Sequence, residues 1–215
     1  GLELQSLCLY ILASFKRDNE KSTEAGLKYF VLSALASGLL LYGCSLIYGF
    51  TGSTNFDSIS QNLIISNMGL IFGIVFVLVG LGFKISAVPF HMWTPDVYEG
   101  SPTSVTSFFS IVPKIAALTV FIRFLYIPFL SAINEWQTIL IFLSLGSMIL
   151  GAVAAIGQTN IKRLIAYSSI GHIGYALAGL ITGTNAGVQS SIIYLTIYAV
   201  MNLAIFGCIF MMKRE

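Results

Sequence analysis

Long runs of apolar residues, separated by short polar stretches, occupy almost the whole chain. A helix needs about 20 apolar residues to cross a bilayer, and most of these runs reach that length. The pattern predicts seven membrane spans, of which the first is partial: residues 2–15, 26–48, 63–84, 103–125, 136–156, 161–181 and 189–212. The chain is therefore predicted to be an all-α, polytopic transmembrane helical bundle that forms a single membrane-embedded domain over residues 1–215.

The third span runs into an apolar stretch that is too long for one crossing. Apart from Lys84, no charged residue occurs from Gln61 to Pro95. Pro89 and Pro95 can break the helix, because proline lacks a backbone N–H donor. The sequence predicts an interruption between Lys84 and Thr94, and a lysine beside a broken helix in hydrocarbon marks a candidate functional site.

The fourth span carries Lys114 near its middle, directly after Pro113. This proline cannot donate to the carbonyl of Phe109, so the helix is predicted to kink or open at that point. In lipid, such a defect persists only where it is buried in protein or lines a water-filled cavity. Lys114 is therefore a second candidate site.

Three ionisable residues lie within the predicted spans: Glu3, Lys84 and Lys114. Each could belong to a structural ion pair, or could extend its head group to the membrane surface. They could also form a proton path, because burial disfavours the charged form of a lysine and a nearby carboxylate favours it. On this hypothesis the three residues are catalytic for proton translocation.

Polar residues recur along one face of each of the last two spans. Ser168, His172 and Tyr175 have helical spacing on the sixth span. The seventh span carries a similar row: Tyr194, Tyr198 and Asn202. Such rows either form interhelical hydrogen bonds, worth about 0.6 kcal/mol each, or order water between buried charges. Ser168, His172, Tyr175 and His91 are candidate supporting polar residues, and Lys114 is expected near the Ser168–His172 face.

Lysine and arginine are concentrated at alternate ends of the spans. The enriched ends carry Lys16, Arg17, Lys21, Lys28, Lys162, Arg163, Lys213 and Arg214, whereas the opposite ends carry Arg123. Cytoplasmic loops carry this excess, so the enriched side is predicted to face the cytoplasm or a mitochondrial matrix. The loop over residues 94–102, with its acids Asp96 and Glu99, is predicted to lie on the same side.

The composition argues against several other classes of protein. Only 9% of the residues are charged, against roughly 25% in soluble chains, and the mean hydropathy is +0.87. A net charge of +2 without a basic cluster does not suggest nucleic-acid binding. Cys8, Cys44 and Cys208 lack the spacing of a metal site and are interpreted as small packing residues. A haem held by His91 and His172 is disfavoured, because no other haem, iron–sulfur or phosphate-binding motif is present.

Four stretches carry a resemblance to a known family. Residues 82–103 read GFKISAVPFHMWTPDVYEGSPT, residues 1–7 read GLELQSL, residues 24–30 read EAGLKYF, and residues 160–175 read NIKRLIAYSSIGHIGY. In this order they resemble the antiporter-like subunits of respiratory complex I, the NADH–quinone oxidoreductase, and most closely subunit 2, which is called subunit N in bacteria. The residues of these four stretches are most similar to those of mitochondrial versions, and an alphaproteobacterial origin is also open.

The resemblance implies a fold and residue roles. Family members have about fourteen spans in two inverted repeats, of which this chain would hold the fifth to the eleventh. It would then be an internal fragment or the product of a split gene, with companion segments supplying the missing spans. Glu3 matches the glutamate that modulates the lysine of the broken span, which is Lys84 here, so the resemblance implies that Glu3 lies within one water of Lys84. Lys114 matches the central lysine of the next span, and His172 lies near the central water axis.

The resemblance also implies an activity, partners and a location. The chain would be a proton-translocating subunit, with other membrane-arm subunits and the lipid bilayer as its partners. NADH, FMN, iron–sulfur clusters and ubiquinone would belong to the wider complex, and this chain would bind no cofactor. The expected location is the mitochondrial inner membrane, or alternatively the bacterial plasma membrane. Three other functions are open: a multisubunit cation/proton antiporter, a plastid-type complex that takes electrons from ferredoxin, and a non-conducting scaffold.

Overall fold

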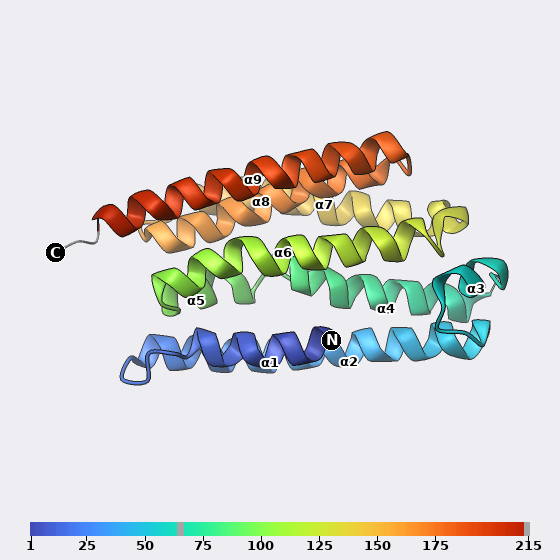
Figure 1. Cartoon of the computed structure of the whole chain (residues 1–215), viewed down its shortest axis with the longest axis horizontal. Helices are drawn as coiled ribbons and strands as arrows, with labels where there is room; N and C mark the ends of the chain where they lie inside the picture. Colours follow the sequence, from blue (N-terminus) through green and yellow to red (C-terminus); the bar gives the residue numbers. More distant parts are fainter. Residues whose placement is uncertain (64–66, 213–215) are drawn as a thin grey trace.

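A computed structural model describes residues 1–63 and 67–212 as a bundle of helices that run along one common axis (Figure 1). Within these residues the regular structure is helical. The elements are α1 (Leu2–Ala13), α2 (Glu20–Thr51), α3 (Phe56–Gln61), α4 (Met68–Ile85), α5 (Trp93–Gly100), α6 (Thr103–Tyr126), the short 3-10 helix η1 (Leu130–Ala132), α7 (Ile133–Ile156), α8 (Ile161–Ile181) and α9 (Asn185–Met212).

Six of the described helical segments are long and apolar enough to cross a membrane, and α1 is a shorter apolar helix. This confirms the predicted all-helical membrane bundle. The predicted bounds of α8 agree with the structure, whereas α2 is longer at both ends than the predicted 26–48. Its extra first turn is capped by Asn19, whose side chain accepts a hydrogen bond from the Lys21 amide.

The sequence did not predict the short elements α3, α5 and η1. Helix α3 begins where the Asn55 side chain accepts a hydrogen bond from the Asp57 amide, a local cap within a stretch that was interpreted as a polar loop. The predicted start of the third span, near Leu63, adjoins residues 64–66, which lie outside the described residues. Helix α4 begins after Asn67, whose side chain caps the Gly69 amide.

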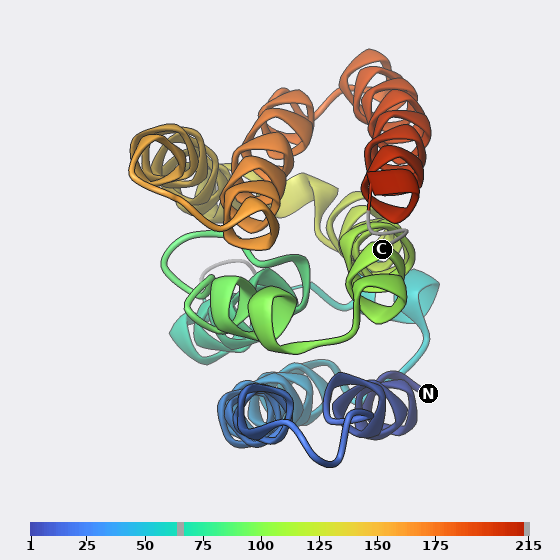
Figure 2. The ribbon, with the colours of Figure 1, turned by 90° about the vertical axis from the view of Figure 1, so that its left-hand side faces the viewer.

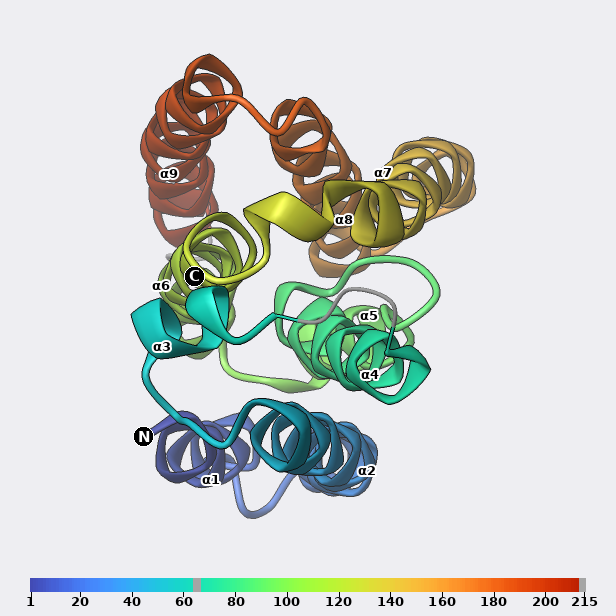
Figure 3. The same ribbon diagram turned by 90° about the vertical axis from the view of Figure 1, so that its right-hand side faces the viewer.

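The helices are arranged in three layers, as Figures 2 and 3 show along the bundle axis. Helices α1 and α2 form one outer layer, α4, α5 and α6 the middle layer, and α7, α8 and α9 the other outer layer. Close packing between helices depends on glycine. A Cβ on Gly151 of α7 would lie 2.6 Å from the backbone nitrogen of Gly171 on α8, and one on Gly43 of α2 would lie 2.8 Å from the carbonyl oxygen of Gly73 on α4.

Helices α4 and α5 together replace one continuous span. In Figure 1, α4 occupies one half of the bundle length and α5 the other, and the loop between them lies near the middle. The N-terminus of the chain also lies near the middle of the long axis, so α1 begins at the depth of this break. The start of α1 and the break after α4 are therefore at similar depth.

One end of the bundle carries most of the charged residues. The α1–α2 loop, α5 and the start of α8 all lie at this end (Figure 1), and ion pairs join Asp96 and Glu99 of α5 to basic residues there. This agrees with the predicted side of the loop 94–102. Lys213 and Arg214, which also entered the prediction of orientation, lie outside the described residues.

The interpretation of the cysteines as packing residues is wrong for the chain by itself. Cys8, Cys44 and Cys208 are exposed on the outer surfaces of their helices. Hydrophobicity alone does not separate a core position from a lipid-facing one, because the outward faces of membrane helices are apolar as well.

Candidate functional site

The predicted break in the third span is present. Helix α4 ends at Ile85, and Ser86 has a left-handed backbone with φ 65°. The carbonyls that the broken helix leaves free find new donors: the Ala87 amide donates to Gly82 at 2.9 Å, and the Trp93 indole donates to Phe83 at 3.0 Å. The break is therefore a closed structure in which buried backbone groups are satisfied.

One of the two predicted helix breakers has the opposite role. Pro89 lies within the loop, and the Val88–Pro89 peptide bond is cis. Pro95, however, lies in the first turn of α5. The first turn of a helix has no internal acceptor for the backbone N–H that proline lacks, so Pro95 is compatible with the start of this helix.

Lys84 is buried at the C-terminal turn of α4, as predicted. Its side chain is 8% exposed, and its Nζ donates to Ser6 Oγ at 2.6 Å and to Ser33 Oγ at 3.1 Å. Glu3 Oε1 lies 3.5 Å from the same nitrogen, which confirms the predicted approach of Glu3 to Lys84. Glu3 in turn accepts a hydrogen bond from Ser37 Oγ at 2.6 Å.

The serines around Lys84 were not predicted, although the sequence contains a signal for them. Ser6 follows Glu3 by three residues on α1, and Ser37 follows Ser33 by four residues on α2. Each pair therefore shares one face of its helix. The two faces meet at Lys84, which places three oxygen atoms around one ammonium group.

Lys114 is buried more deeply than Lys84 and is 1% exposed. Its Nζ donates to Ser169 Oγ of α8, and it lies 5.4 Å from the centre of the Tyr98 ring on α5. Among the described residues, no carboxylate forms an ion pair with it. The expected Ser168–His172 face does lie near Lys114, since His172 is close enough for an electrostatic interaction with it. The hydrogen-bond partner is the next residue, because neighbouring residues differ by about 100° around a helix and Ser169 is the serine that points inward.

Helix α6 is continuous through Pro113, so the predicted opening is limited to its hydrogen bonds. The carbonyl of Phe109, which Pro113 deprives of a helical donor, accepts a hydrogen bond from the Tyr98 hydroxyl at 3.2 Å. The next carbonyl, that of Ser110, accepts one from the Tyr198 hydroxyl at 3.0 Å. Tyrosines from α5 and α9 thus satisfy the backbone beside Lys114.

The predicted polar row of α8 lines a groove between α7 and α8. Ser168, His172 and Tyr175 share this groove, which has a volume of about 430 Å³. His172 Nδ1 is hydrogen-bonded to the Tyr194 hydroxyl of α9 at 2.6 Å, whereas Tyr175 is 56% exposed. His91 lies in the loop between α4 and α5, and its Nδ1 is buried without a hydrogen-bond partner among the described residues.

A small cavity lies between the two lysine-bearing helices. Ser6, Tyr29 and Lys84 line one side of it, and Pro113, the neighbour of Lys114, lines the other. Its volume is about 20 Å³, and a site of roughly 10–15 Å³ or more on this measure can hold one water if polar groups line it. The cavity therefore has room for about one water between Lys84 and the face of α6 that carries Pro113 and Ala117.

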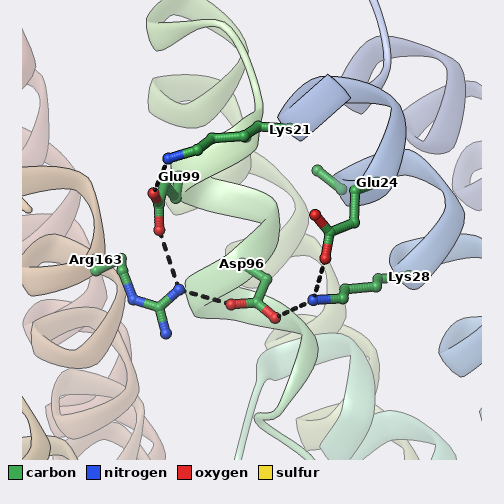
Figure 4. A pocket seen from close by; sticks show the side chains of 8 residues that line it. Lys21, Glu24, Lys28, Asp96, Glu99 and Arg163 are labelled. Carbon is green, nitrogen blue, oxygen red and sulfur yellow. Dashed lines mark hydrogen bonds and ion pairs between the residues drawn. The ribbon is translucent and has the colours of Figure 1, made fainter. Parts of the chain in front are cut away.

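A cluster of six charged side chains closes the charged end of the bundle (Figure 4). Arg163 Nη1 of α8 contacts Asp96 at 2.7 Å and Glu99 at 3.1 Å. Lys28 contacts Asp96 at 2.8 Å, and Lys21 contacts Glu99 at 3.0 Å, both from α2. The sixth member is Glu24, at 2.6 Å from Lys28. The cluster therefore joins α2, α5 and α8.

The ion pairs also set the protonation of the two acids on α5. Burial of Asp96 raises its pKa, but hydrogen bonds from Lys28 and Arg163 outweigh burial and hold the pKa below the ordinary 3.8. The hydrogen bond from Lys21 is the main cause that lowers the pKa of Glu99 below its ordinary 4.5. Both acids are therefore charged at neutral pH. Over the part of the chain that the structure describes, no group of three or more histidine, cysteine or acidic side chains could hold a metal ion.

Comparison with known proteins shows the family of the chain. A family model described as "NADH:quinone oxidoreductase/Mrp antiporter, TM" matches residues 1–215. NADH-quinone oxidoreductase subunit N of Pelagibacter ubique is 75% identical over 215 residues, which are 100% of this chain and 46% of that protein. Subunit N of Parvibaculum lavamentivorans is 63% identical over 217 residues, with 100% of this chain and 45% of that protein covered.

Solved structures show the same arrangement of helices. A chain of respiratory complex I from Thermus thermophilus has a TM-score of 0.82 and 39% identity, covering 96% of this chain and 44% of that one. A chain of the Mrp complex from Dietzia sp. has a TM-score of 0.87 and 25% identity, covering 95% and 39% respectively. The chain spans less than half the length of the relatives it matches. It belongs to the family of membrane subunits that NADH:quinone oxidoreductases and Mrp antiporters share.

Proposed function

We propose that this chain supplies proton-carrying residues of subunit N, an antiporter-like subunit in the membrane arm of an NADH–quinone oxidoreductase. The observation that carries the proposal is the pair of buried lysines on adjoining helices, of which one pairs with a carboxylate and the other, among the residues that the structure describes, does not. Lys84 is held by Glu3, whereas Lys114 is buried with a serine and an aromatic ring. Buried ionisable residues of membrane helices typically mark ion or proton pathways.

The surroundings of the two lysines support an exchange of protons between them. An ammonium group has three N–H donors, and Glu3, Ser6 and Ser33 offer Lys84 three acceptor oxygens. A displacement of Glu3 removes the one negative charge from this set and favours release of the proton. The cavity beside Pro113, with room for about one water, provides a route from Lys84 toward Lys114.

The oxidoreductase is favoured over the antiporter by sequence and not by fold. The Mrp chain superposes at least as well as the complex I chain, with TM-scores of 0.87 and 0.82, but their identities to this chain are 25% and 39%. The two relatives named above, both subunit N, are 75% and 63% identical. The plastid-type complex and the non-conducting scaffold lack a comparable observation in their favour.

The location and partners follow from the same relatives. These relatives are bacterial, which favours the bacterial plasma membrane over the mitochondrial inner membrane. Other membrane-arm subunits and lipid would cover the apolar outer faces of α2, α7 and α9. NADH, FMN, iron–sulfur clusters and ubiquinone would be bound elsewhere in the complex, so that this chain moves protons without a cofactor of its own.

The test is the replacement of Lys114 in the assembled complex. Lys114→Met retains an apolar stem of similar length but cannot carry a proton, and Lys114→Arg retains the charge but does not release it. We expect both variants to lose most NADH-driven proton uptake into membrane vesicles, together with coupled NADH–quinone turnover. Lys16→Met, in the exposed α1–α2 loop, is the matched control and should pump normally.

Wild-type pumping by an assembled Lys114→Met complex would overturn the proposal. The antiporter is tested in the same membranes, by adding Na⁺ or K⁺ without NADH. Proton movement that depends on these cations and not on NADH would assign the chain to an antiporter instead.

A further inference from the structure

Helix α5 has two sides with different surroundings. Asp96 and Glu99 belong to the ion-pair cluster, which holds α5 against α2 and α8 (Figure 4). Trp93, Val97 and Tyr98 are buried in the bundle, with Tyr98 0% exposed. The short helix is therefore held at the charged end by ion pairs, while its aromatic side chains are buried inside the bundle.

The two aromatic side chains of α5 contact the helices of both lysines. The Trp93 indole donates to the carbonyl of Phe83, the residue before Lys84. The Tyr98 hydroxyl donates to the carbonyl of Phe109 on α6, which Pro113 leaves without a helical donor. Helix α5 therefore binds α4 beside Lys84 and α6 beside Lys114.

Tyr98 also contacts Lys114 itself. The Nζ atom lies 5.4 Å from the centre of the Tyr98 ring, within the roughly 6 Å over which a cation is attracted to an aromatic face. Ser169 of α8 accepts the hydrogen bond from the same nitrogen. Among the described residues no carboxylate pairs with Lys114. The face of the Tyr98 ring is therefore the electron-rich group that attracts this ammonium.

We propose that Tyr98 is a positioning residue for proton transfer by Lys114, in which the ring face holds the ammonium group beside Ser169 and the hydroxyl anchors the ring to the carbonyl that Pro113 releases. The inference rests on the proposed proton-carrying role of Lys114. Because Lys162 Nζ of α8 donates to Ser101 at the end of α5, the helices that provide Ser169 and Tyr98 are tied together. The ammonium is therefore held between two groups whose separation is fixed.

The first experiment separates the ring from the hydroxyl. Tyr98→Phe keeps the ring face and loses the anchor, whereas Tyr98→Leu loses both. A cation–π contact corresponds to about 2-fold in an equilibrium at an exposed site and about 30-fold when it is desolvated, so we expect Tyr98→Leu to lower proton uptake per NADH by about threefold or more. Tyr98→Phe should retain most of the uptake. The pH profile of uptake should shift by about half a unit or more in Tyr98→Leu and much less in Tyr98→Phe.

The second experiment leaves the packing almost unchanged. Phenylalanines with increasing numbers of ring fluorines are incorporated at position 98, which weakens the negative ring face stepwise at nearly constant size. We expect proton uptake per NADH to fall with each added fluorine, and the pH profile to shift in step. The same series at Phe129, a buried ring packed against Phe124, is the control and should give a flat response.

Two results would overturn the inference, and they differ from failure of the proposed function. A flat fluorine series at position 98, or a Tyr98→Leu complex that pumps with a wild-type pH profile, removes Tyr98 from the mechanism while Lys114→Met still abolishes uptake. If Lys114→Met itself pumps normally, the proposed function fails first. A variant that only destabilises the complex lowers the amount of assembled complex, and it does not change the number of protons taken up per NADH oxidised in a graded way.

Discussion

Replacement of Glu3 by glutamine tests whether the carboxylate controls Lys84. Glu3→Gln removes one negative charge and keeps the size and the hydrogen-bonding oxygen of the side chain. The amide oxygen of the variant side chain can still accept from Ser37, which donates to Glu3 at 2.6 Å in the natural chain. The change that remains is the loss of the charge at 3.5 Å from Lys84 Nζ.

The size of the effect follows from that distance and from exposure. Two unit charges 3.5 Å apart attract each other by about 5 kcal/mol at an effective dielectric constant of 20. Glu3 is 41% exposed in this chain, so solvent screens part of the attraction, whereas Lys84 is 8% exposed. Exposed pairs contribute up to about 1 kcal/mol, and breaking a buried pair costs about 3–5 kcal/mol. We therefore expect Glu3→Gln to weaken the stabilisation of the Lys84 ammonium by about 1.4–2.8 kcal/mol, which is roughly 10- to 100-fold in the equilibrium between its protonated and neutral forms.

The assay is NADH-driven proton uptake into inverted membrane vesicles, followed with a pH-sensitive dye and divided by the rate of NADH oxidation. We expect Glu3→Gln to slow uptake by about tenfold if occupation of the Lys84 site limits the rate. Glu135→Gln makes the same chemical change at an exposed position at the start of α7 and should have little effect. An assembled Glu3→Gln complex that pumps like Glu135→Gln would refute the modulating role of Glu3.

Two further predictions concern stability. Gly151→Ala should lower the stability of the complex in detergent by about 1–3 kcal/mol, because the new Cβ would lie 2.6 Å from the Gly171 backbone. Gly38→Ala, which has open space around it, should not lower the stability, and equal effects of the two variants would contradict this packing. The pKa values of Asp96 and Glu99 are lower in the folded state than their ordinary values of 3.8 and 4.5, so these ionised acids stabilise the folded state at any pH above those ordinary values. The stabilisation is lost as the pH falls through the lower pKa values of the folded state. The melting temperature should therefore fall on acidification below about pH 4.5, and less so in Arg163→Gln, which already lacks two of the ion pairs; identical pH profiles would exclude this contribution.

The sequence was sufficient for the features that depend on local chemistry. The break after Lys84 could be predicted because an overlong apolar run contains prolines, and the approach of Glu3 followed from the resemblance to a known family. The role of Pro95 could not be predicted from residue type alone. A proline is disruptive inside a helix and harmless in its first turn, and only the position at which α5 begins distinguishes the two cases.

The partners of Lys114 depend on contacts between distant segments. Ser168 and Ser169 are adjacent serines, and the sequence favoured the first because it shares a face with His172. Which serine points inward depends on the rotation of α8 about its axis, and α8 presents Gly171 to Gly151 of α7 at a close approach that the sequence alone does not reveal. Tyr98 was missed for a similar reason, because its partner is a carbonyl that becomes available only through Pro113, in another helix.

The distribution of acids gives the two buried lysines different roles. In the cluster at the charged end, Glu24, Asp96 and Glu99 face Lys21, Lys28 and Arg163, so the charges within the cluster are balanced. In the interior, Glu3 is the carboxylate that lies near Lys84, and Lys114 pairs with no acid among the described residues. A permanent cation at Lys114 would therefore be costly in hydrocarbon, and only a group that can lose its proton avoids that cost. The arrangement thus favours Lys84 as the site that holds a proton and Lys114 as the site through which the proton passes.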